Sequence, residues 1–394
     1  MPASQQVTHS LSIKKLKGIS SLDEVRFDEK PLTAILGPNG CGKSTILHAL
    51  ACCYKPAEGS DQQNWQFRDF FTPTTDSTWA GSSLAMVHSY RDGTTEFTNL
   101  RTEYRKNADR WSPRYANRPE RYVQFIGIKS CVPQIEEETY TSAINYQTET
   151  HADAGLIMSK MGTVFNRAYT ELNIHQARAK RQYPGLALDG TRYSALAMGA
   201  GEQRVLEILS AVFNAPKYAL LLIDEIDLLL HTAALTKLIE ILFQRAQEKS
   251  LQIVFTTHRE AILELKNMVS IKHIHTVKAV SKTYCFSNTK PDALRLRAVG
   301  TRNPVGLVAT VFPEFIARDG QEPTNVDRQG NKHLEGAARR LCRGHGQMRL
   351  DGPRARATVG DKVMRSEKTV ARVTTQAADC TQAKRAGPVL DAGP

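Results

Sequence analysis

The segment that most constrains the fold of this chain is residues 32–53, LTAILGPNGCGKSTILHALACC. Residues 33–36 predict a short apolar strand, residues 37–44 spell G-x-x-x-x-G-K-S, and residues 45–53 carry apolar side chains at helical spacing. Glycines let such a loop curl with its backbone N–H groups facing an anion, and the helix adds its positive end. The alternative is a chance glycine-rich turn, but strand, loop and helix in this order predict a phosphate-binding loop.

The loop also predicts what each side chain does. Lys43 is expected to reach the β- and γ-phosphates of a bound nucleotide, and the Ser44 hydroxyl is expected to be a ligand of Mg²⁺. The predicted nucleotide contacts in this segment are Gly37, Pro38, Asn39, Gly40, Cys41, Gly42, Lys43, Ser44 and Thr45.

Composition limits where such a protein works. The chain has 394 residues, 41% of them apolar, and no run near the roughly 20 apolar residues of a membrane span. No signal peptide is evident, and the seven cysteines show no C-x-x-C pair. We therefore expect a soluble cytoplasmic protein without a membrane partner. The formal net charge of +12 suggests contact with a polyanion.

The C-terminal part of the chain differs from the rest. Beyond about residue 300 it is rich in Gly, Ala and Arg, and from residue 318 onward it has no Phe, Trp or Tyr. Such a segment has little with which to build a core. We expect residues 301–394 to be a poorly structured basic tail that is not a native domain of the family, following an ATPase domain over residues 1–300.

Residues 10–122 predict strands and one basic, aromatic stretch. Residues 11–18 and 22–27 alternate apolar and polar as antiparallel strands do, and Arg91-Asp92-Gly93 indicates a hairpin turn. Residues 101–122 mix seven Arg or Lys with Tyr104, Trp111, Tyr115 and Tyr122. Basic groups among aromatic rings suit a nucleic-acid backbone with unstacked bases. A solvated arm whose aromatic side chains pack into the protein is an alternative that the sequence leaves open.

Three later segments could complete a nucleotide site. Met198-Gly199-Ala200-Gly201-Glu202-Gln203 is a small-residue loop before an apolar helix, which is either an anion site or a helix start that needs small residues. Asp224 and Glu225 follow a buried strand, where Asp224 would hold Mg²⁺ through water and Glu225 would accept a proton from the attacking water, unless both only cap the strand. His258 ends another apolar strand and could hydrogen-bond the γ-phosphate, although a lone histidine there is often a local cap.

The order of these segments resembles ABC-type ATPases, in particular the SMC/RecF-like branch and the bacterial AAA-family ATPases of anti-phage defence, such as Septu-type, retron-associated and overcoming-lysogeny-type proteins. The resemblance covers roughly residues 10–300. It implies an α/β P-loop NTPase fold, with a mixed central sheet flanked by helices, an antiparallel β subdomain and a helical signature subdomain. An insertion is then expected at about 55–122 and the helical part at about 140–215.

The resemblance assigns a role to each motif. Residues 37–44 resemble Walker A, Asp224 and Glu225 resemble Walker B with its catalytic glutamate, and His258 resembles the switch histidine. Gln134 resembles the Q-loop glutamine, which contacts nucleotide and metal. The expected catalytic residues are Lys43, Glu225 and His258, the expected metal ligands are Ser44, Asp224 and Gln134, and the further nucleotide contacts are Gln134, Gly199, Ala200, Gly201 and Glu202.

The family also implies a mechanism, with ATP and Mg²⁺ as cofactors. The signature loop of one protomer closes over ATP bound to the other, so ATP binding forms a head-to-tail homodimer and hydrolysis opens it. This dimer would control nucleic-acid engagement or a nuclease or effector partner in anti-phage defence. A DNA-repair or clamp-type RecF-like ATPase and a truncated ATP-dependent nuclease are the alternatives. Met198-Gly199-Ala200-Gly201 replaces the usual Leu-Ser-Gly-Gly, so a serine contact to the γ-phosphate is missing.

Overall fold

The computed structural model describes residues 4–107, 110–139, 142–150, 154–177, 181–277 and 281–287. All of them belong to the first of two compact units, Met1–Val311, whereas the second unit, Phe312–Pro394, lies outside the described residues. The expectation for a tail over residues 301–394 therefore also lies outside them. No helix in the described part of the chain is both long and apolar enough to cross a bilayer.

An eleven-stranded mixed sheet carries the fold, in the order β6-β5-β4-β1-β2-β15-β14-β3-β13-β12-β7. Its parallel part consists of β14, β3, β13, β12 and β7, and every residue of β3, β12 and β13 is buried. Uniform burial explains the continuous apolar runs of these strands in the sequence. The bounds are β3 Leu32–Leu36, β7 Val123–Ile126, β12 Leu220–Ile223, β13 Gln252–Thr256 and β14 Val269–Val277.

The other strands of this sheet are mostly antiparallel. The predicted pair at residues 11–27 is confirmed, because β1 and β2 pair antiparallel. The predicted hairpin is also confirmed, since Asp92 pairs with Thr95 across Gly93, whose φ is 56°. Residues 55–122, expected as an insertion, instead supply strands of the large sheet itself. The bounds are β1 Ser4–Lys15, β2 Leu22–Arg26, β4 Ser83–Asp92, β5 Thr95–Asn107, β6 Arg110–Ser112 and β15 Lys282–Ser287.

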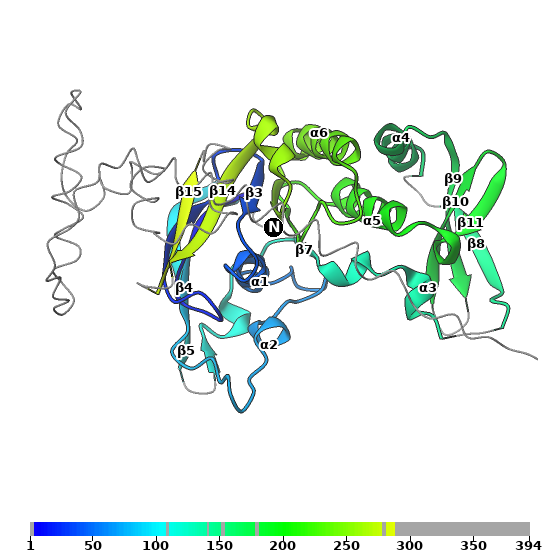
Figure 1. Ribbon diagram of the computed structural model, residues 1–394. Coiled ribbons are helices and arrows are strands. Elements are labelled where there is room, and N and C mark those ends of the chain that lie inside the picture. Colours follow the sequence, from blue (N-terminus) through cyan, green and yellow to red (C-terminus); the bar gives the residue numbers. More distant parts are fainter. Residues whose placement is uncertain are drawn as a thin grey trace, which may run out of the picture. The chain divides into compact units, whose positions relative to one another are not determined.

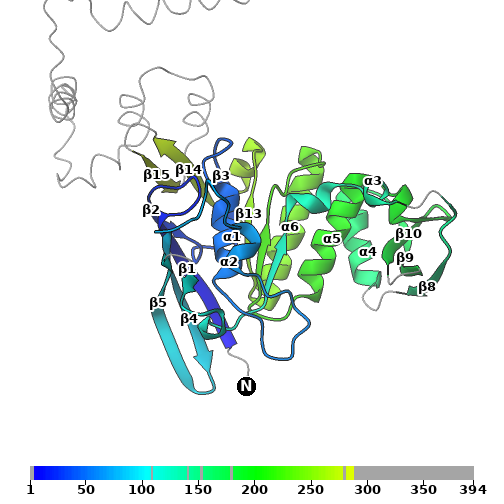
Figure 2. The ribbon, with the colours of Figure 1, turned by 90° about the horizontal axis from the view of Figure 1, so that it is seen from below.

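Helices cover both faces of the parallel strands (Figures 1 and 2). On β12, Leu221 and Ile223 join the core that contains α5 and α6, while Leu220 and Leu222 join the core that contains α1. This alternation across a strand gives the sheet two apolar cores. The α/β class, with a mixed sheet flanked by helices, is thus confirmed. The helices are α1 Lys43–Cys52, α2 Phe67–Phe70, α3 Gln134–Glu137, α4 Ala154–Phe165, α5 Ala200–Asn214 and α6 Thr232–Lys249.

The region expected to be helical, about 140–215, is only partly so. Four of its segments form an antiparallel sheet in the order β11-β10-β9-β8, and α4 packs against β9 and α5. Within this region the helix α4 ends at Phe165, because Asn166 adopts a φ of 55° and β9 begins at Tyr169. The strands are β8 Tyr146–Thr150, β9 Tyr169–Ala177, β10 Gln182–Leu188 and β11 Thr191–Ser194.

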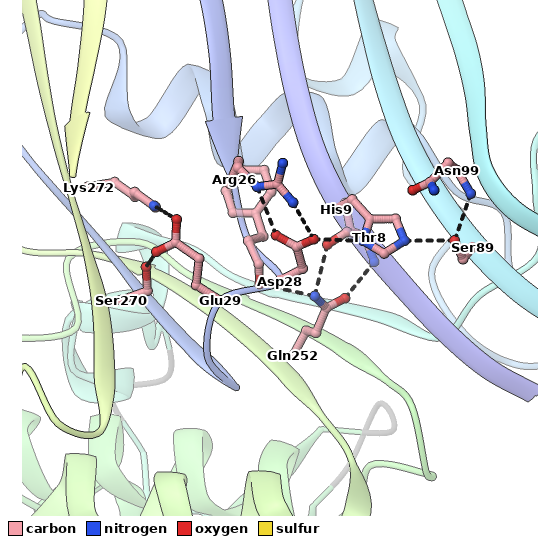
Figure 3. A network of polar contacts seen from close by, with 11 residues as sticks. Thr8, His9, Arg26, Asp28, Glu29, Ser89, Asn99, Gln252, Ser270 and Lys272 are labelled. Carbon is pink, nitrogen blue, oxygen red and sulfur yellow. Dashed lines mark hydrogen bonds and ion pairs between the residues drawn. The ribbon is translucent and has the colours of Figure 1, made fainter. Parts of the chain in front are cut away.

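A polar network joins the antiparallel strands to the parallel ones (Figure 3). Gln252, the first residue of β13, accepts a hydrogen bond from the Thr8 N–H at 2.7 Å and donates to the Thr8 carbonyl at 2.9 Å. Asp28 accepts hydrogen bonds from His9 and Arg26, and these bonds hold its pKa below the usual value although burial acts to raise it. The hydrogen bonds of Gln252 thus hold the first residue of β13 against β1, and the opposite end of β13 lies at the candidate site.

Candidate functional site

The loop at residues 37–42 has the conformation that the sequence predicts. It connects β3 to α1, and Gly42 at the N-cap of α1 has a φ of 103°, a region that favours glycine. A Cβ at Gly37 would lie only 2.4 Å from the Ile274 carbonyl oxygen. Neither position could hold a larger residue without moving the loop, so these glycines are required by geometry.

Lys43 lies over this loop. Its Nζ donates hydrogen bonds to the carbonyl oxygens of Gly37 at 2.9 Å and Pro38 at 3.2 Å, and the residue is only 7% exposed. The first turn of α1 has no acidic residue and no side-chain cap. Its N–H groups and the ammonium group therefore face the loop without a carboxylate from that turn, as an anion site requires.

Asp224 brings three distant segments together at the carboxyl ends of the parallel strands. Its Oδ1 accepts a hydrogen bond from Ser44 Oγ at 3.1 Å and another from Thr256 Oγ1 at 2.7 Å. The carboxylate is buried, with the residue 3% exposed. Ser44 is the second residue of α1, Asp224 follows β12 and Thr256 ends β13, so the predicted juxtaposition of the serine and the aspartate is present.

Glu225 and His258 lie beside each other next to this aspartate. Glu225 Oε1 is 3.8 Å from His258 Nε2, and both side chains are partly exposed. The Glu225 N–H donates to Thr256 Oγ1 at 2.7 Å, and the residue has a φ of 49°. A left-handed glutamate is strained and persists only where its surroundings hold it, which is common at functional sites.

The small-residue loop lies at the start of α5, with Gly199 as its N-cap. Gly201 packs against the backbone after the Asp224-Glu225 pair, because a Cβ there would come within 2.9 Å of the Leu229 carbonyl oxygen. The Glu202 carboxylate accepts hydrogen bonds from Arg167 at 2.9 Å and Tyr169 at 2.6 Å. These partners tie Glu202 to β9, so the expected nucleotide contact by its side chain is not supported.

Gln134 is not joined to the predicted metal ligands. Its N–H donates to Gln203 Oε1 at 3.1 Å, beside the small-residue loop, and its own Oε1 is buried without a hydrogen-bond partner. A 3-10 turn, Ile128–Cys131, separates it from the end of β7. The described hydrogen bonds of Gln134 include neither Ser44 nor Asp224, and its expected contact with metal and nucleotide stays a prediction.

Arg204 and Thr256 were missed from the sequence. Arg204 is fully buried and donates to the Asp224 carbonyl at 2.7 Å and the Gly127 carbonyl at 3.0 Å, with Ser130 as a third partner. It therefore joins α5 to the ends of β12 and β7. The available signals were an arginine next to the apolar run 205–213 and a Thr-Thr pair at the end of an apolar strand.

The basic, aromatic stretch 101–122 is used partly for packing. Tyr104 is fully buried and donates a hydrogen bond to the Cys53 carbonyl at 2.6 Å. Arg118 and Arg121 are also buried, and Arg118 donates to the Cys52 carbonyl at 2.8 Å, at the end of α1. For these three residues the packing alternative holds, and nucleic-acid contact is left to the exposed part of the stretch.

Comparison with protein families gives two matches. Residues 10–181 match a model described as "AAA domain", and residues 177–264 match "AAA domain, putative AbiEii toxin, Type IV TA system". Among curated proteins, "Phosphonates import ATP-binding protein PhnC 2" of Albidiferax ferrireducens is 57% identical over 37 residues, 8% of this chain and 13% of that protein. "Phosphate import ATP-binding protein PstB 2" of Lactiplantibacillus plantarum is 35% identical over 75 residues, 18% of this chain and 28% of that protein.

Solved structures with a similar arrangement include heads of SMC proteins. The SMC head domain from Thermotoga maritima aligns with a TM-score of 0.42 and 14% identity, over 71% of this chain and 98% of that one. The Smc head from Pyrococcus furiosus, bound to the C-terminal domain of ScpA, aligns with a TM-score of 0.47 and 12% identity, over 75% and 99%.

The chain spans between 13% and 28% of the length of these two curated relatives. Together with the loop geometry at Lys43 and the contacts of Asp224, the two AAA-domain matches indicate a P-loop nucleotide site similar to those of AAA domains.

Proposed function

We propose that this protein hydrolyses ATP at the site formed by the residue 37–44 loop and the ends of β12 and β13. One observation carries the proposal: Ser44 and Thr256 both donate to one oxygen of Asp224, with Lys43 next in sequence to Ser44. A hydroxyl and a buried carboxylate at 3.1 Å fit a Mg²⁺ site in which Ser44 binds the ion directly and Asp224 holds it through water.

Each residue of the site then has a separate role in the proposed reaction. Lys43 exchanges its bonds to the loop carbonyls for bonds to the β- and γ-phosphates, and the loop N–H groups hold the phosphates in place. A Mg²⁺ ion held by Ser44 and Asp224 would offset the charge of the phosphates. Glu225 orients the attacking water and accepts its proton, while His258, 3.8 Å away, donates to the γ-phosphate.

The small-residue loop acts in a second copy of the chain. We place residues 199–201 over the nucleotide of the partner protomer, so that ATP binding favours the closed dimer and hydrolysis releases it. Support comes from α5, whose N-cap Gly199 has no side chain and whose Glu202 is occupied by Arg167 and Tyr169. Only backbone groups of this loop are then available to an anion.

The dimer cycle is proposed to control nucleic-acid engagement, or a nuclease or effector partner, in anti-phage defence. The match over residues 177–264, whose description names a putative AbiEii toxin, supports this assignment. A clamp-type RecF-like ATPase is the alternative, which would hydrolyse ATP slowly and faster with DNA. An ATP-dependent nuclease would cleave DNA without an added partner.

The test of ATP hydrolysis uses one substitution at two places. Asp224→Asn removes the buried charge, and we expect the rate of phosphate release with Mg²⁺ and ATP to fall by about a hundredfold or more. Asp189→Asn makes the same change at an exposed turn between β10 and β11 and should keep the wild-type rate. Equal rates for the two variants would contradict the proposal.

A further inference from the structure

A cavity of about 330 Å³ lies between α2, β5, β6 and the turn that follows β6. This volume is at the small end of the range for small-molecule pockets, roughly 300–1,000 Å³. It is separate from the loop at residues 37–44, none of whose residues lines it. Its polar and aromatic lining consists of Arg68, Lys106, Arg110, Trp111, Arg114 and Tyr115.

The lining is strongly basic. No carboxylate among the described residues lines the cavity. Lys106 is buried and donates to the Thr78 carbonyl at 2.7 Å, so its position is fixed by the protein. Arg68, Arg110 and Arg114 are exposed, and within the part of the chain that the structure describes they form no ion pair. Exposed guanidinium groups of this kind bind phosphate with paired hydrogen bonds.

The cavity also has flat aromatic walls. Trp111 is held in place by stacking on Phe67, with ring centroids 4.0 Å apart and planes 12° apart. Tyr115 is fixed by the Arg118 guanidinium, whose central carbon lies 4.8 Å from the ring centroid. Rings held from one side present a rigid surface on which a planar heterocycle can stack.

We infer that this cavity binds one nucleotide unit of a single-stranded nucleic acid. The base stacks against Trp111 or Tyr115, and the flanking phosphates lie at the three exposed arginines. The inference rests on the nucleic-acid branch of the proposed function but not on ATP hydrolysis. A free mononucleotide offers the same base and phosphate chemistry. Three separate guanidinium groups around one cavity favour a strand, since a strand carries phosphate on both sides of the base.

Binding of a fluorescein-labelled oligo(dT) 20-mer to the full chain, measured by anisotropy without ATP, tests this inference. We expect the double variant Arg110→Gln/Arg114→Gln to bind at least tenfold more weakly at about 0.1 M salt. Its plot of log affinity against log salt should also be shallower by about 1.4, because two phosphate contacts are lost. The matched control, Arg192→Gln/Lys217→Gln, also removes two exposed charges, lies outside both the cavity and residues 101–122, and should bind like the wild type.

A second measurement does not depend on the arginines. Oligo(dT) should quench the tryptophan fluorescence of the wild type, and Trp111→Phe, which keeps an aromatic ring against Phe67, should lose that quenching. Thymidine monophosphate is the second ligand to be tested. If it binds the cavity as tightly as oligo(dT) does, the base and phosphate chemistry is supported, but the ligand is a free nucleotide and not a strand.

Two results would overturn the inference. One is an Arg110→Gln/Arg114→Gln variant that binds and responds to salt as the Arg192→Gln/Lys217→Gln control does. The other is a wild-type chain that binds neither oligo(dT) nor thymidine monophosphate at low salt. Because binding is measured without ATP, either result alongside normal ATP hydrolysis removes the cavity assignment alone. A wild-type chain that binds oligo(dT) but does not hydrolyse ATP would contradict only the proposed ATPase activity.

Discussion

Asp224 is the residue on which the site converges, and its environment is set by Thr256 as much as by Ser44. The Thr256 hydroxyl donates to Asp224 Oδ1 and accepts from the Glu225 N–H, both at 2.7 Å. One side chain therefore positions the proposed metal-holding carboxylate and the backbone of the proposed base. Thr256 is fully buried at the end of β13, so water cannot take its place.

At this scale we predict that Thr256→Val slows ATP hydrolysis about tenfold or more while ATP still binds. Valine keeps the shape but removes a hydrogen bond to a charged group, which is typically worth about 1.5–3 kcal/mol. Thr256→Ser keeps the hydroxyl and should stay close to the wild-type rate. Phosphate release and nucleotide affinity measure the two effects separately, and a fully active valine variant would remove Thr256 from the site.

The residues that the sequence identified are those whose position follows from local pattern. Asp224 could be predicted because it directly follows an apolar strand. Ser44 could be predicted because it lies in the helix that follows a G-x-x-x-x-G-K-S loop after another apolar strand. Gln134 was assigned by its order in the chain alone. In the structure a 3-10 turn lies between β7 and Gln134, and the Gln134 N–H donates to the Gln203 side chain. The apolar residues after Arg204 indicate a buried helix but not the role of the arginine, because its three carbonyl and hydroxyl partners come from distant segments.

At the scale of elements, Arg204 holds α5 against the ends of β12 and β7. We predict that Arg204→Met lowers the free energy of unfolding by about 2–5 kcal/mol, because the Asp224 and Gly127 carbonyls lose a buried donor. Arg192→Met changes an exposed arginine of β11 and should leave that free energy unchanged. Urea denaturation measures both, and equal unfolding free energies for the two variants would show that α5 does not depend on this arginine.

The contact of α1 with α2 and β7 contains a partly buried histidine. His48 stacks on Phe70 with ring centroids 4.2 Å apart and meets Phe125 edge-on at 5.2 Å, and its Nδ1 has no partner. Burial lowers the pKa of His48 from 6.5 to about 4, with Asp224 acting to raise it and Lys17 to lower it further. The folded protein therefore favours the neutral form of the His48 ring.

This lowered pKa predicts a pH dependence. The unfolded chain takes up a proton at His48 near pH 6.5, whereas the folded chain does so only near pH 4. The contribution of His48 to stability is thus complete above about pH 6.5, and up to about 3 kcal/mol is lost as the pH falls toward 4. Urea denaturation at pH 7 and pH 5 should show a smaller loss for His48→Phe than for the wild type, and an equal loss would contradict the assignment.

The pattern of apolar residues predicted some helices and strands correctly and missed others. The strand, loop and helix around Lys43 and the β4–β5 hairpin were predictable, because each has its own local signal. The four-stranded sheet of β8–β11 was missed, because the family resemblance implied a helical part at about 140–215. Asp189-Gly190 carries a hairpin signal between β10 and β11 that could have corrected this, with φ values of 51° and 78°.

At the scale of the whole molecule, the proposed mechanism of ATP hydrolysis requires two copies of the chain. In one copy the residue 199–201 loop packs against the segment that follows Glu225, and Glu202 is bound within its own chain. The loop can act on a triphosphate only by offering backbone groups, and we assign that triphosphate to the partner copy. The dimer should therefore form with ATP, persist when hydrolysis is blocked, and fail when ATP does not bind.

The mass of the protein in solution, measured by light scattering with Mg²⁺ and ATP, tests this central claim most directly. We predict that Glu225→Gln, which keeps the shape of Glu225 but cannot accept a proton from water, accumulates as a dimer with ATP and is monomeric with ADP. Lys43→Ala, which loses the phosphate contact, should stay monomeric with either nucleotide. If both variants stay monomeric with ATP and hydrolyse it at the wild-type rate, the shared site does not exist.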